Sequence, residues 1–225
     1  MRHTLNANIM RMIGLSFIIC HLSFSVCACS EKTDEENEYA NWKARNDAYF
    51  ATLEAKYSAQ ADGQWLRLKS FSKDPATAKD LTECIYAQVL EKGTGTESPL
   101  YTDSVRVSYR GRLIPTDAHP DGYVFDGTAY GEYNAKTNAT VKFLLSDNLV
   151  AGFKTALFHM HRGDTWRVYI PYNLGYGSVK SGSIPAYSTL IFELTLVDFQ
   201  RAGHTMEPYS ARAVNRNERT HHPIE

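Results

Sequence analysis

Three of the four cysteines in this 225-residue chain lie near its start, where they are candidates for modification rather than for pairing. Arg2 and Arg11 precede an apolar run over residues 13–26, an order typical of a secretory signal and too short for a comfortable membrane span. The run ends in V-C-A-C over 26–29, which is similar to a bacterial lipobox, where the cysteine after a small residue receives lipid. Residues 1–28 are therefore predicted to be a lipoprotein signal peptide, and Cys29, which follows an alanine, the lipidation site.

This prediction decides what the remaining thiol can do. A chain that begins at a lipid-modified Cys29 leaves Cys84 without a disulfide partner, even in an oxidising compartment. Residues 29–38 are rich in acidic side chains and are expected to form a solvated tether. The predicted location is that of an exported bacterial lipoprotein, anchored to a membrane and facing the periplasm or the cell surface. The alternative is an ordinary cleaved signal with incidental cysteines.

The sequence gives little support for a metal site or for nucleic-acid binding. His159 and His161 have a spacing that can place two imidazoles on one face of a strand, but no cysteine or carboxylate is arranged to complete a metal site. A formal net charge of -1 argues against nucleic acid as a partner, because such binders normally carry a basic face. No metal and no cofactor are predicted.

The first folded segment, residues 39–75, is predicted to be helical. Large apolar side chains between Tyr39 and Tyr57 follow helical spacing and indicate one helix over about 40–59. A second, short helix is expected around Trp65 to Phe71. A single amphipathic helix must bury its apolar stripe, either on the main domain or on a second copy of the chain. A homodimer through this helix is therefore one predicted partner.

From about residue 82 to 200 the period of apolar residues changes to two. Alternating stretches over 105–109, 141–145, 166–170 and 190–196 predict strands with one buried face, as an antiparallel sheet requires. Residues 148–158 have helical spacing, with Asp147 or Asn148 as the predicted N-cap. The expected class is α+β, a twisted antiparallel sheet wrapped on one short helix. Residues 201–225 are polar, without periodicity, and are expected to be a disordered tail.

Motifs in this β-rich part occur in a specific order. They are C-I-Y-A-Q-V-L-E-K-G-T-G over 84–95, D-S-V-R-V-S-Y-R-G-R-L over 103–113, V-F-D-G-T over 124–128, V-A-G-F over 150–153, I-P-Y-N-L-G-Y-G over 170–177 and I-P-A-Y-S-T-L-I-F-E-L over 184–194. Each motif alone is weak, but the ordered set resembles the FKBP-type peptidyl-prolyl cis-trans isomerases. The resemblance implies the fold of that family for residues 82–200.

The chemistry of such an enzyme needs no nucleophile, metal or redox group. Rotation about a peptide bond faces a barrier of about 18–20 kcal/mol, although the two forms of an X-Pro bond lie within about 0.5–1 kcal/mol. Acceleration from tens of seconds to milliseconds requires lowering the barrier by about 5–6 kcal/mol. Twisting the amide reduces its dipole, so a dry aromatic pocket suits the twisted form better than water does.

The resemblance also implies which residues form the pocket. Tyr109, Phe125, Phe153 and Phe192 would be its aromatic walls, and Val150 and Ile184 would add aliphatic surface, with the Val150 N–H as a substrate donor. Asp126 would lie at the rim, and the Tyr176 hydroxyl would point at a substrate carbonyl. Val141 occupies a wall position that is often aromatic in the family, so one side of the pocket is expected to be open.

The predicted function is isomerisation of X-Pro bonds in exported proteins, and the predicted partners are proline-containing polypeptides. The resemblance adds macrolide-type inhibitors as candidate ligands of the same pocket. The alternative is a chaperone or scaffold module that binds proline-containing segments with little turnover.

Overall fold

The structure is a computed structural model that describes residues 38–206, except 62, 78–79, 129–130 and 135–136. Contacts divide the chain into residues 1–34 and 35–225, and every described residue belongs to the second unit. The predicted signal peptide, the lipidation site Cys29, nearly all of the tether and most of the tail lie outside the described residues.

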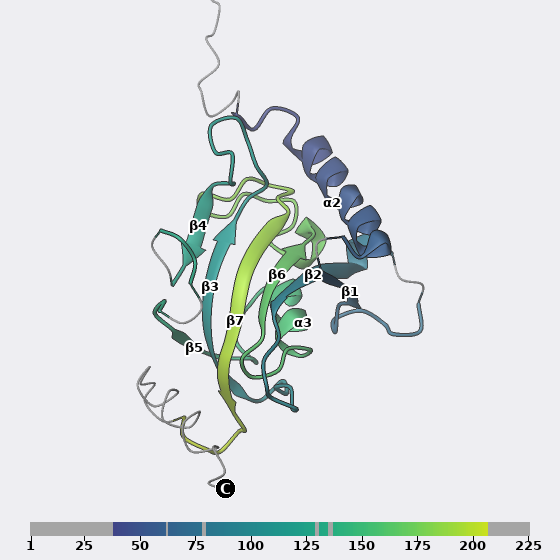
Figure 1. Ribbon diagram of the computed structural model, residues 1–225. Helices are drawn as coiled ribbons and strands as arrows, with labels where there is room; N and C mark the ends of the chain where they lie inside the picture. Colours follow the sequence, from purple (N-terminus) through teal and green to yellow (C-terminus); the bar gives the residue numbers. More distant parts are fainter. Residues whose placement is uncertain (1–37, 62, 78–79, 129–130, 135–136, 207–225) are drawn as a thin grey trace, which may run out of the picture. The chain divides into compact units, whose positions relative to one another are not determined.

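One antiparallel sheet forms the centre of the described part (Figure 1). Its strands are β1 (Gln64–Lys69), β2 (Cys84–Glu91), β3 (Ser104–Arg112), β4 (Val124–Gly127), β5 (Val141–Leu144), β6 (Thr165–Ile170) and β7 (Leu190–Gln200). The order across the sheet is β1-β2-β6-β7-β3-β4, and β5 pairs with β3 beside this path. Strand β3 shows most of the predicted alternation, whereas β6 and most of β7 are buried on both faces, so the expectation of one outward face is wrong for these two strands. The predicted α+β class, an antiparallel sheet with one short helix on it, is confirmed.

Two helices cover opposite faces of this sheet. On β6, Ile170 packs over Gly152 of α3 (Ala151–Leu157), so closely that a Cβ at Gly152 would lie 2.3 Å from the Ile170 side chain. The neighbouring Tyr169 points to the other face, where its ring lies 6.5 Å from that of Tyr49 in α2 (Trp42–Ala59). Because successive residues of a strand face opposite ways, the two helices sandwich the sheet.

Helix α2 matches the predicted helix over 40–59 and buries its apolar side on its own chain. Trp42, Phe50 and Leu53 are all buried, and the Phe50 ring packs against Tyr86 of β2 at 5.3 Å. This resolves the choice left open by the sequence, since these side chains are covered without a second copy. A homodimer through α2 stays a prediction, and it would have to use the other side of the helix.

Three sequence predictions need correction. The short helix expected around Trp65 to Phe71 is wrong, because Gln64–Lys69 is strand β1, paired antiparallel with β2. The sheet therefore begins before residue 82. Helix α3 begins at Ala151, with neither Asp147 nor Asn148 as its N-cap. The disordered tail over 201–225 stays a prediction, since the structure describes only its first six residues, of which Met206 is buried.

The face that carries α2 also holds a compact charge cluster on β3, β6 and β7. Glu193 is 5% exposed, and its carboxylate accepts hydrogen bonds from Arg110 at 2.7 Å, Arg112 at 3.2 Å and Arg167 at 3.1 Å. Burial alone would raise the pKa of Glu193, but the hydrogen bond from Arg110 and the charge of Arg112 outweigh burial and lower it. Glu193 is therefore the ionised centre of the cluster.

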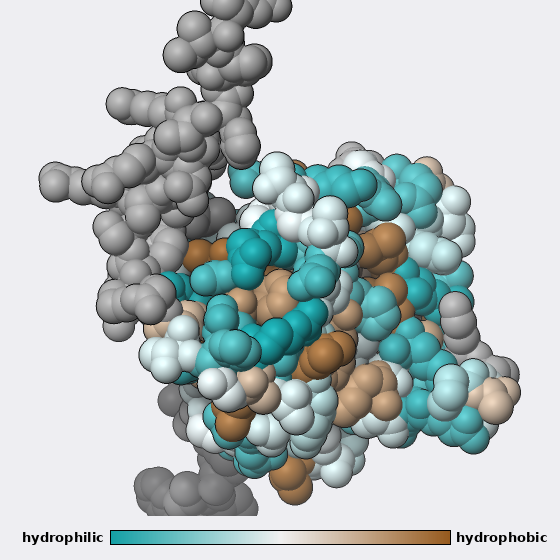
Figure 2. Space-filling model, turned by 90° about the horizontal axis from the view of Figure 1, so that it is seen from below, coloured by the Kyte–Doolittle hydropathy of each residue, from teal (hydrophilic) through white to brown (hydrophobic). Residues whose placement is uncertain are grey.

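The surface seen from below carries apolar residues in small areas separated by polar ones (Figure 2). Within the described ranges, no helix is both long and apolar enough to cross a membrane.

Candidate active site

A hollow of about 160 Å³ lies between the sheet, α3 and the loop after β6. Its lining comes from β3, β4, β5, α3, β7 and two connecting segments: Tyr109, Asp126, Phe143, Asn148, Leu149, Val150, Phe153, Tyr176 and Phe192. A cavity of about 150 Å³ holds a ring the size of benzene, so this hollow has room for the five-membered ring of proline.

Aromatic rings form the base and walls of the hollow. Phe153 lies at the centre, with ring centroids 5.7 Å from Tyr109, 6.3 Å from Phe143 and 5.1 Å from Phe192. The three contacts have interplanar angles of 70–89°, the edge-to-face arrangement that aromatic pairs prefer. The rings thus brace one another and leave an apolar concavity.

Two strands fix the polar side of this concavity. The Tyr109 hydroxyl, on β3, donates a 2.7 Å hydrogen bond to Oδ2 of Asp126, on β4, and Oδ1 of Asp126 accepts the N–H of Gly127. Burial raises the pKa of Tyr109 above its ordinary value, and the hydrogen bond to Asp126 raises it further. Tyr109 is therefore a neutral donor held in place by a carboxylate at the rim.

Two further hydrogen-bond donors, the Tyr176 hydroxyl and the Val150 N–H, border the hollow. Burial, followed by the charge of Asp126, raises the pKa of Tyr176, so its hydroxyl stays protonated at neutral pH. The Tyr176 side chain is 40% exposed and can meet a ligand from outside. Among the described residues no acceptor takes the Val150 N–H, which lies at the start of α3. Both groups can donate to the carbonyls of a bound peptide.

Among the described residues, no group of three or more His, Cys, Asp or Glu side chains is placed to hold a metal ion. The hollow offers apolar aromatic walls, neutral hydrogen-bond donors and one carboxylate at its edge. This arrangement suits a ligand that changes shape and dipole without making or breaking bonds.

Comparison with known protein families also points to a reaction in which no covalent bond is made or broken. Residues 95–197, which include every residue that lines the hollow, match the family described as FKBP-type peptidyl-prolyl cis-trans isomerase. These residues are an FKBP-type isomerase domain. Strands β1 and β2 and helix α2 lie outside the matched range, although β1 and β2 belong to the same sheet.

Relatives differ in how much of their length this chain covers. The protein named "Macrophage infectivity potentiator" from Trypanosoma cruzi is 27% identical over 193 residues, 85% of this chain and 82% of the relative. FkpA from Escherichia coli (strain K12), named an FKBP-type peptidyl-prolyl cis-trans isomerase, is 32% identical over 64% of this chain. The chain spans about half of FkpA, with 47% covered. A crystal structure of Escherichia coli FkpA has 28% identity over 72% of this chain and 62% of that chain, with a TM-score of 0.49.

Six of the eight pocket residues predicted for the FKBP-type domain lie together around the hollow: Tyr109, Asp126, Val150, Phe153, Tyr176 and Phe192. Phe125 and Ile184 do not line it. The Phe125 ring packs edge-on against Phe192 at 5.6 Å, and Ile184 is 5% exposed. In this structure the Phe125 ring supports the wall through Phe192, and Ile184 is a buried residue outside the lining. Catalytic roles for the eight residues stay predictions.

Sequence reasoning missed Phe143 and assigned an open wall at Val141. The structure places Phe143, not Val141, in the lining, with its ring 6.1 Å from Tyr109. Both residues belong to the same alternating stretch, so the period of two could have identified either as the wall residue. The expected opening on that side is therefore filled.

Gly111 is a second residue whose importance the sequence did not reveal. A Cβ at this position of β3 would lie 2.7 Å from both Phe125 and Phe192. A glycine inside a strand often marks the close approach of another group, and this was the available signal. Its missing side chain lets the two rings lie directly on the strand.

Proposed function

We propose that this chain catalyses cis-trans isomerisation of X-Pro bonds in exported polypeptides. The observation that carries the proposal is the open, ring-lined hollow, large enough for a prolyl ring and bordered by neutral hydrogen-bond donors. The family match of residues 95–197 supports the same reaction.

In the proposed mechanism the prolyl ring rests on Phe153 between Tyr109, Phe143 and Phe192. The planar amide is more polar than the twisted one, so apolar walls disfavour the planar form relative to the transition state. The hydroxyl of Tyr176 and the N–H of Val150 donate to the substrate carbonyls as the bond rotates. Catalysis then requires shape, low polarity and donors, and no covalent step.

A proline-limited refolding assay with the full chain tests the proposal on adjacent residues of β5. Phe143→Ala removes a wall of the hollow, whereas Lys142→Ala changes the exposed neighbour that does not line it. We expect wild type and Lys142→Ala to accelerate the slow refolding phase, and Phe143→Ala to lose about tenfold or more of kcat/KM, since a truncated aromatic wall weakens the fit to the transition state.

Equal activity of the two variants would contradict the hollow as the site. Absence of acceleration by wild type, with retained binding of a proline peptide, would instead favour the chaperone or scaffold module.

Export and anchoring form a separate part of the proposal, supported by the apolar run and the V-C-A-C sequence over 26–29. In a bacterial host, Cys29→Ala should abolish incorporation of labelled fatty acid and release the chain from membranes. The matched change Cys27→Ala should leave both unaltered. Fatty-acid labelling that persists in Cys29→Ala would overturn the assignment, and labelling lost only in Cys27→Ala would move it to the neighbouring cysteine.

A further inference from the structure

Helix α2 lies outside the matched domain, yet it holds the loop before β7 through two buried hydrogen bonds. The Oδ1 atom of Asn46 accepts the N–H of Thr189 at 2.7 Å, and the Trp42 indole N–H donates to Oγ of Ser188 at 2.8 Å. All four residues are at most 6% exposed. Buried polar groups that lose their partners are costly, so these bonds fix the loop against the helix.

The loop held in this way contains a backbone conformation that needs support. Tyr187 has φ of 64°, in the left-handed region that side chains other than glycine rarely adopt. Such a residue persists only where its surroundings determine it strongly. The Tyr187 ring meets Tyr172 edge-on at 5.3 Å, and Nζ of Lys43 lies 5.7 Å from the Tyr187 ring and 5.5 Å from the Tyr172 ring.

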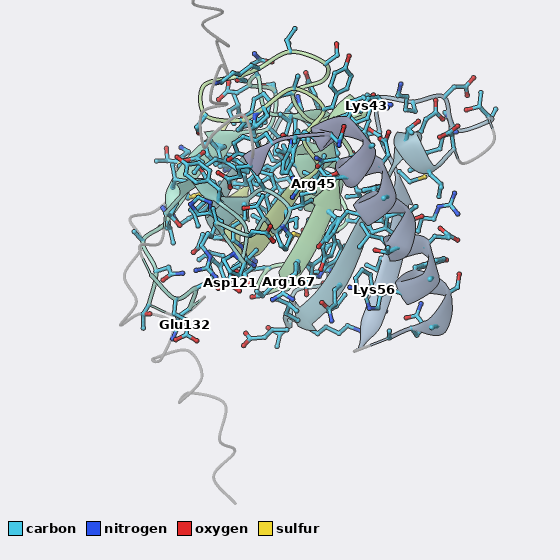
Figure 3. The ribbon with its side chains drawn as sticks, turned by 90° about the horizontal axis from the view of Figure 1, so that it is seen from above. Lys43, Arg45, Lys56, Asp121, Glu132 and Arg167 are labelled. Atoms are coloured by element: carbon cyan, nitrogen blue, oxygen red, sulfur yellow. The ribbon has the colours of Figure 1, made fainter. Side chains whose placement is uncertain are left out.

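Lys43 belongs to the first turn of α2, at the end of the helix beside the loops of the C-terminal half (Figure 3). The start of this helix therefore contacts three successive residues of the loop. Lys43 meets Tyr187, Trp42 meets Ser188 and Asn46 meets Thr189. The contact is concentrated at one end of the helix and one short stretch of the loop.

From this segment a short path leads to the hollow. The N–H of Tyr187 donates to the carbonyl of Gly177 at 2.9 Å, and Gly177 directly follows Tyr176, which lines the hollow. On the other side, Oγ of Ser188 donates to the carbonyl of Pro185, next to Ile184. The segment that α2 holds thus sets the backbone beside the one tyrosine that reaches the substrate from outside.

We propose that Trp42 and Asn46 are positioning residues for the isomerase, which keep Tyr176 aimed into the hollow by holding Ser188 and Thr189. The proposal rests on the proposed function and adds to it that α2 is part of the catalytic unit. Because Tyr176 would act on the rotating carbonyl, loosening this support should lower kcat more than it weakens peptide binding.

The test compares full-chain variants at a temperature where each is folded. Asn46→Leu keeps the side-chain volume and removes the acceptor for Thr189 together with the Nδ2 donor to the carbonyl of Trp42. Asn46→Asp restores the acceptor oxygen but not that donor. Trp42→Phe keeps an aromatic ring, removes the donor to Ser188 and loses some packing volume, so it serves if Asn46→Leu does not fold. Leu53→Ala is the control, since Leu53 is buried in the same helix and is about two turns away from Asn46.

Two readouts are needed: kcat and Kd for a proline peptide from NMR line shapes, and hydrogen exchange of residues 176–189. We expect Asn46→Leu to lower kcat about tenfold with Kd changed less than about twofold, because a small misplacement of a positioning group is costly. Trp42→Phe should also lower kcat, by a smaller factor. Asn46→Asp should recover part of the loss, because it restores the acceptor for Thr189 but not the donor to the carbonyl of Trp42. Exchange over 176–189 should rise in Asn46→Leu and stay unchanged in Leu53→Ala.

A folded Asn46→Leu variant with unchanged kcat and unchanged exchange would overturn the positioning role. Equal loss of kcat in Leu53→Ala at a matched melting temperature would also overturn it, because the effect would then be general destabilisation. An inactive wild type would refute the proposed function instead, and the exchange measurement would still decide whether α2 holds the loop.

Discussion

At the scale of single residues, the hydrogen bond between Tyr109 and Asp126 is the clearest link between structure and activity. Asp126 is exposed, so its role in stability is small, yet it fixes the hydroxyl of a ring that forms the wall of the hollow. We predict that Asp126→Asn lowers kcat/KM several-fold and shifts the melting temperature by no more than about 2–4 °C, the change expected for about 1 kcal/mol in a domain of this size. Peptide assays and calorimetry check both values; a large loss of melting temperature would show that the carboxylate is structural.

Gly111 carries a second prediction at this scale. Gly111→Ala places a methyl group 2.7 Å from Phe125 and Phe192, and overpacking of this kind typically costs about 1–3 kcal/mol. Because these rings support the hollow, the variant should lose stability and most of its activity together. Urea unfolding and the refolding assay test this. Gly127→Ala on β4, where the nearest contact would be 3.0 Å from a backbone oxygen, is the milder comparison. Equal effects of the two changes would contradict the claim that the close approach of Phe125 and Phe192 requires a glycine at position 111.

At the scale of elements, the Glu193 cluster joins β3, β6 and β7 through three arginines. Removing its charge leaves cations without their partner, and breaking such a pair costs about 3 kcal/mol or more. Since the folded-state pKa of Glu193 is lowered, the stabilisation is present above the unfolded-state pKa and is lost as pH falls through the folded-state value. Glu193→Gln should therefore unfold at lower urea concentration at pH 7, and its stability should fall less steeply than that of wild type on acidification.

Parallel urea titrations at about pH 7 and about pH 4 measure both effects. A variant as stable as wild type at pH 7 would mean that the cluster is screened by solvent and contributes little.

Elements also show where sequence reasoning succeeds. Strands β3, β6 and β7 were predictable because large apolar residues recur at every second position of their sequences, although β6 and most of β7 turn out to be buried on both faces. Strand β1, where a short helix was expected, shows no period of two in its burial. Trp65 is its one buried residue, and the four residues after it are half-buried on both faces of the sheet, so buried and exposed residues do not alternate along it. Helix α2 was predictable in position, but its contacts with Ser188 and Thr189 are not, since they join residues 146 and 143 apart in sequence.

The same reasoning applies within the site. Four of its five aromatic members, Tyr109, Phe153, Tyr176 and Phe192, follow from the ordered motifs, and six of the eight predicted residues line the hollow. The choice of Phe143 over Val141 depends on how β5 pairs with β3, and the sequence does not determine that register.

At the scale of the whole molecule, the folding unit is larger than the segment that matches the family. Trp42, Phe50, Leu53 and Trp65 are all buried, and each such side chain contributes about 1.5–3 kcal/mol. Together these four side chains contribute a free energy comparable to the whole net stability of a typical domain, about 5–15 kcal/mol. We predict that a piece covering residues 82–206 is unfolded or aggregated, whereas residues 38–206 unfold cooperatively. Size-exclusion chromatography and urea unfolding compare the two; equal midpoints would refute this boundary.

The central claim is that the hollow accelerates rotation of a proline amide rather than only binding it. Two-dimensional exchange NMR on an Ala-Pro peptide tests this most directly, because it observes both isomers at equilibrium in the presence of the full chain. We expect exchange cross-peaks that report cis-trans exchange within about milliseconds to a second, whereas exchange in the free peptide takes tens of seconds. Peptide signals that shift on binding while exchange stays at the uncatalysed rate would contradict it.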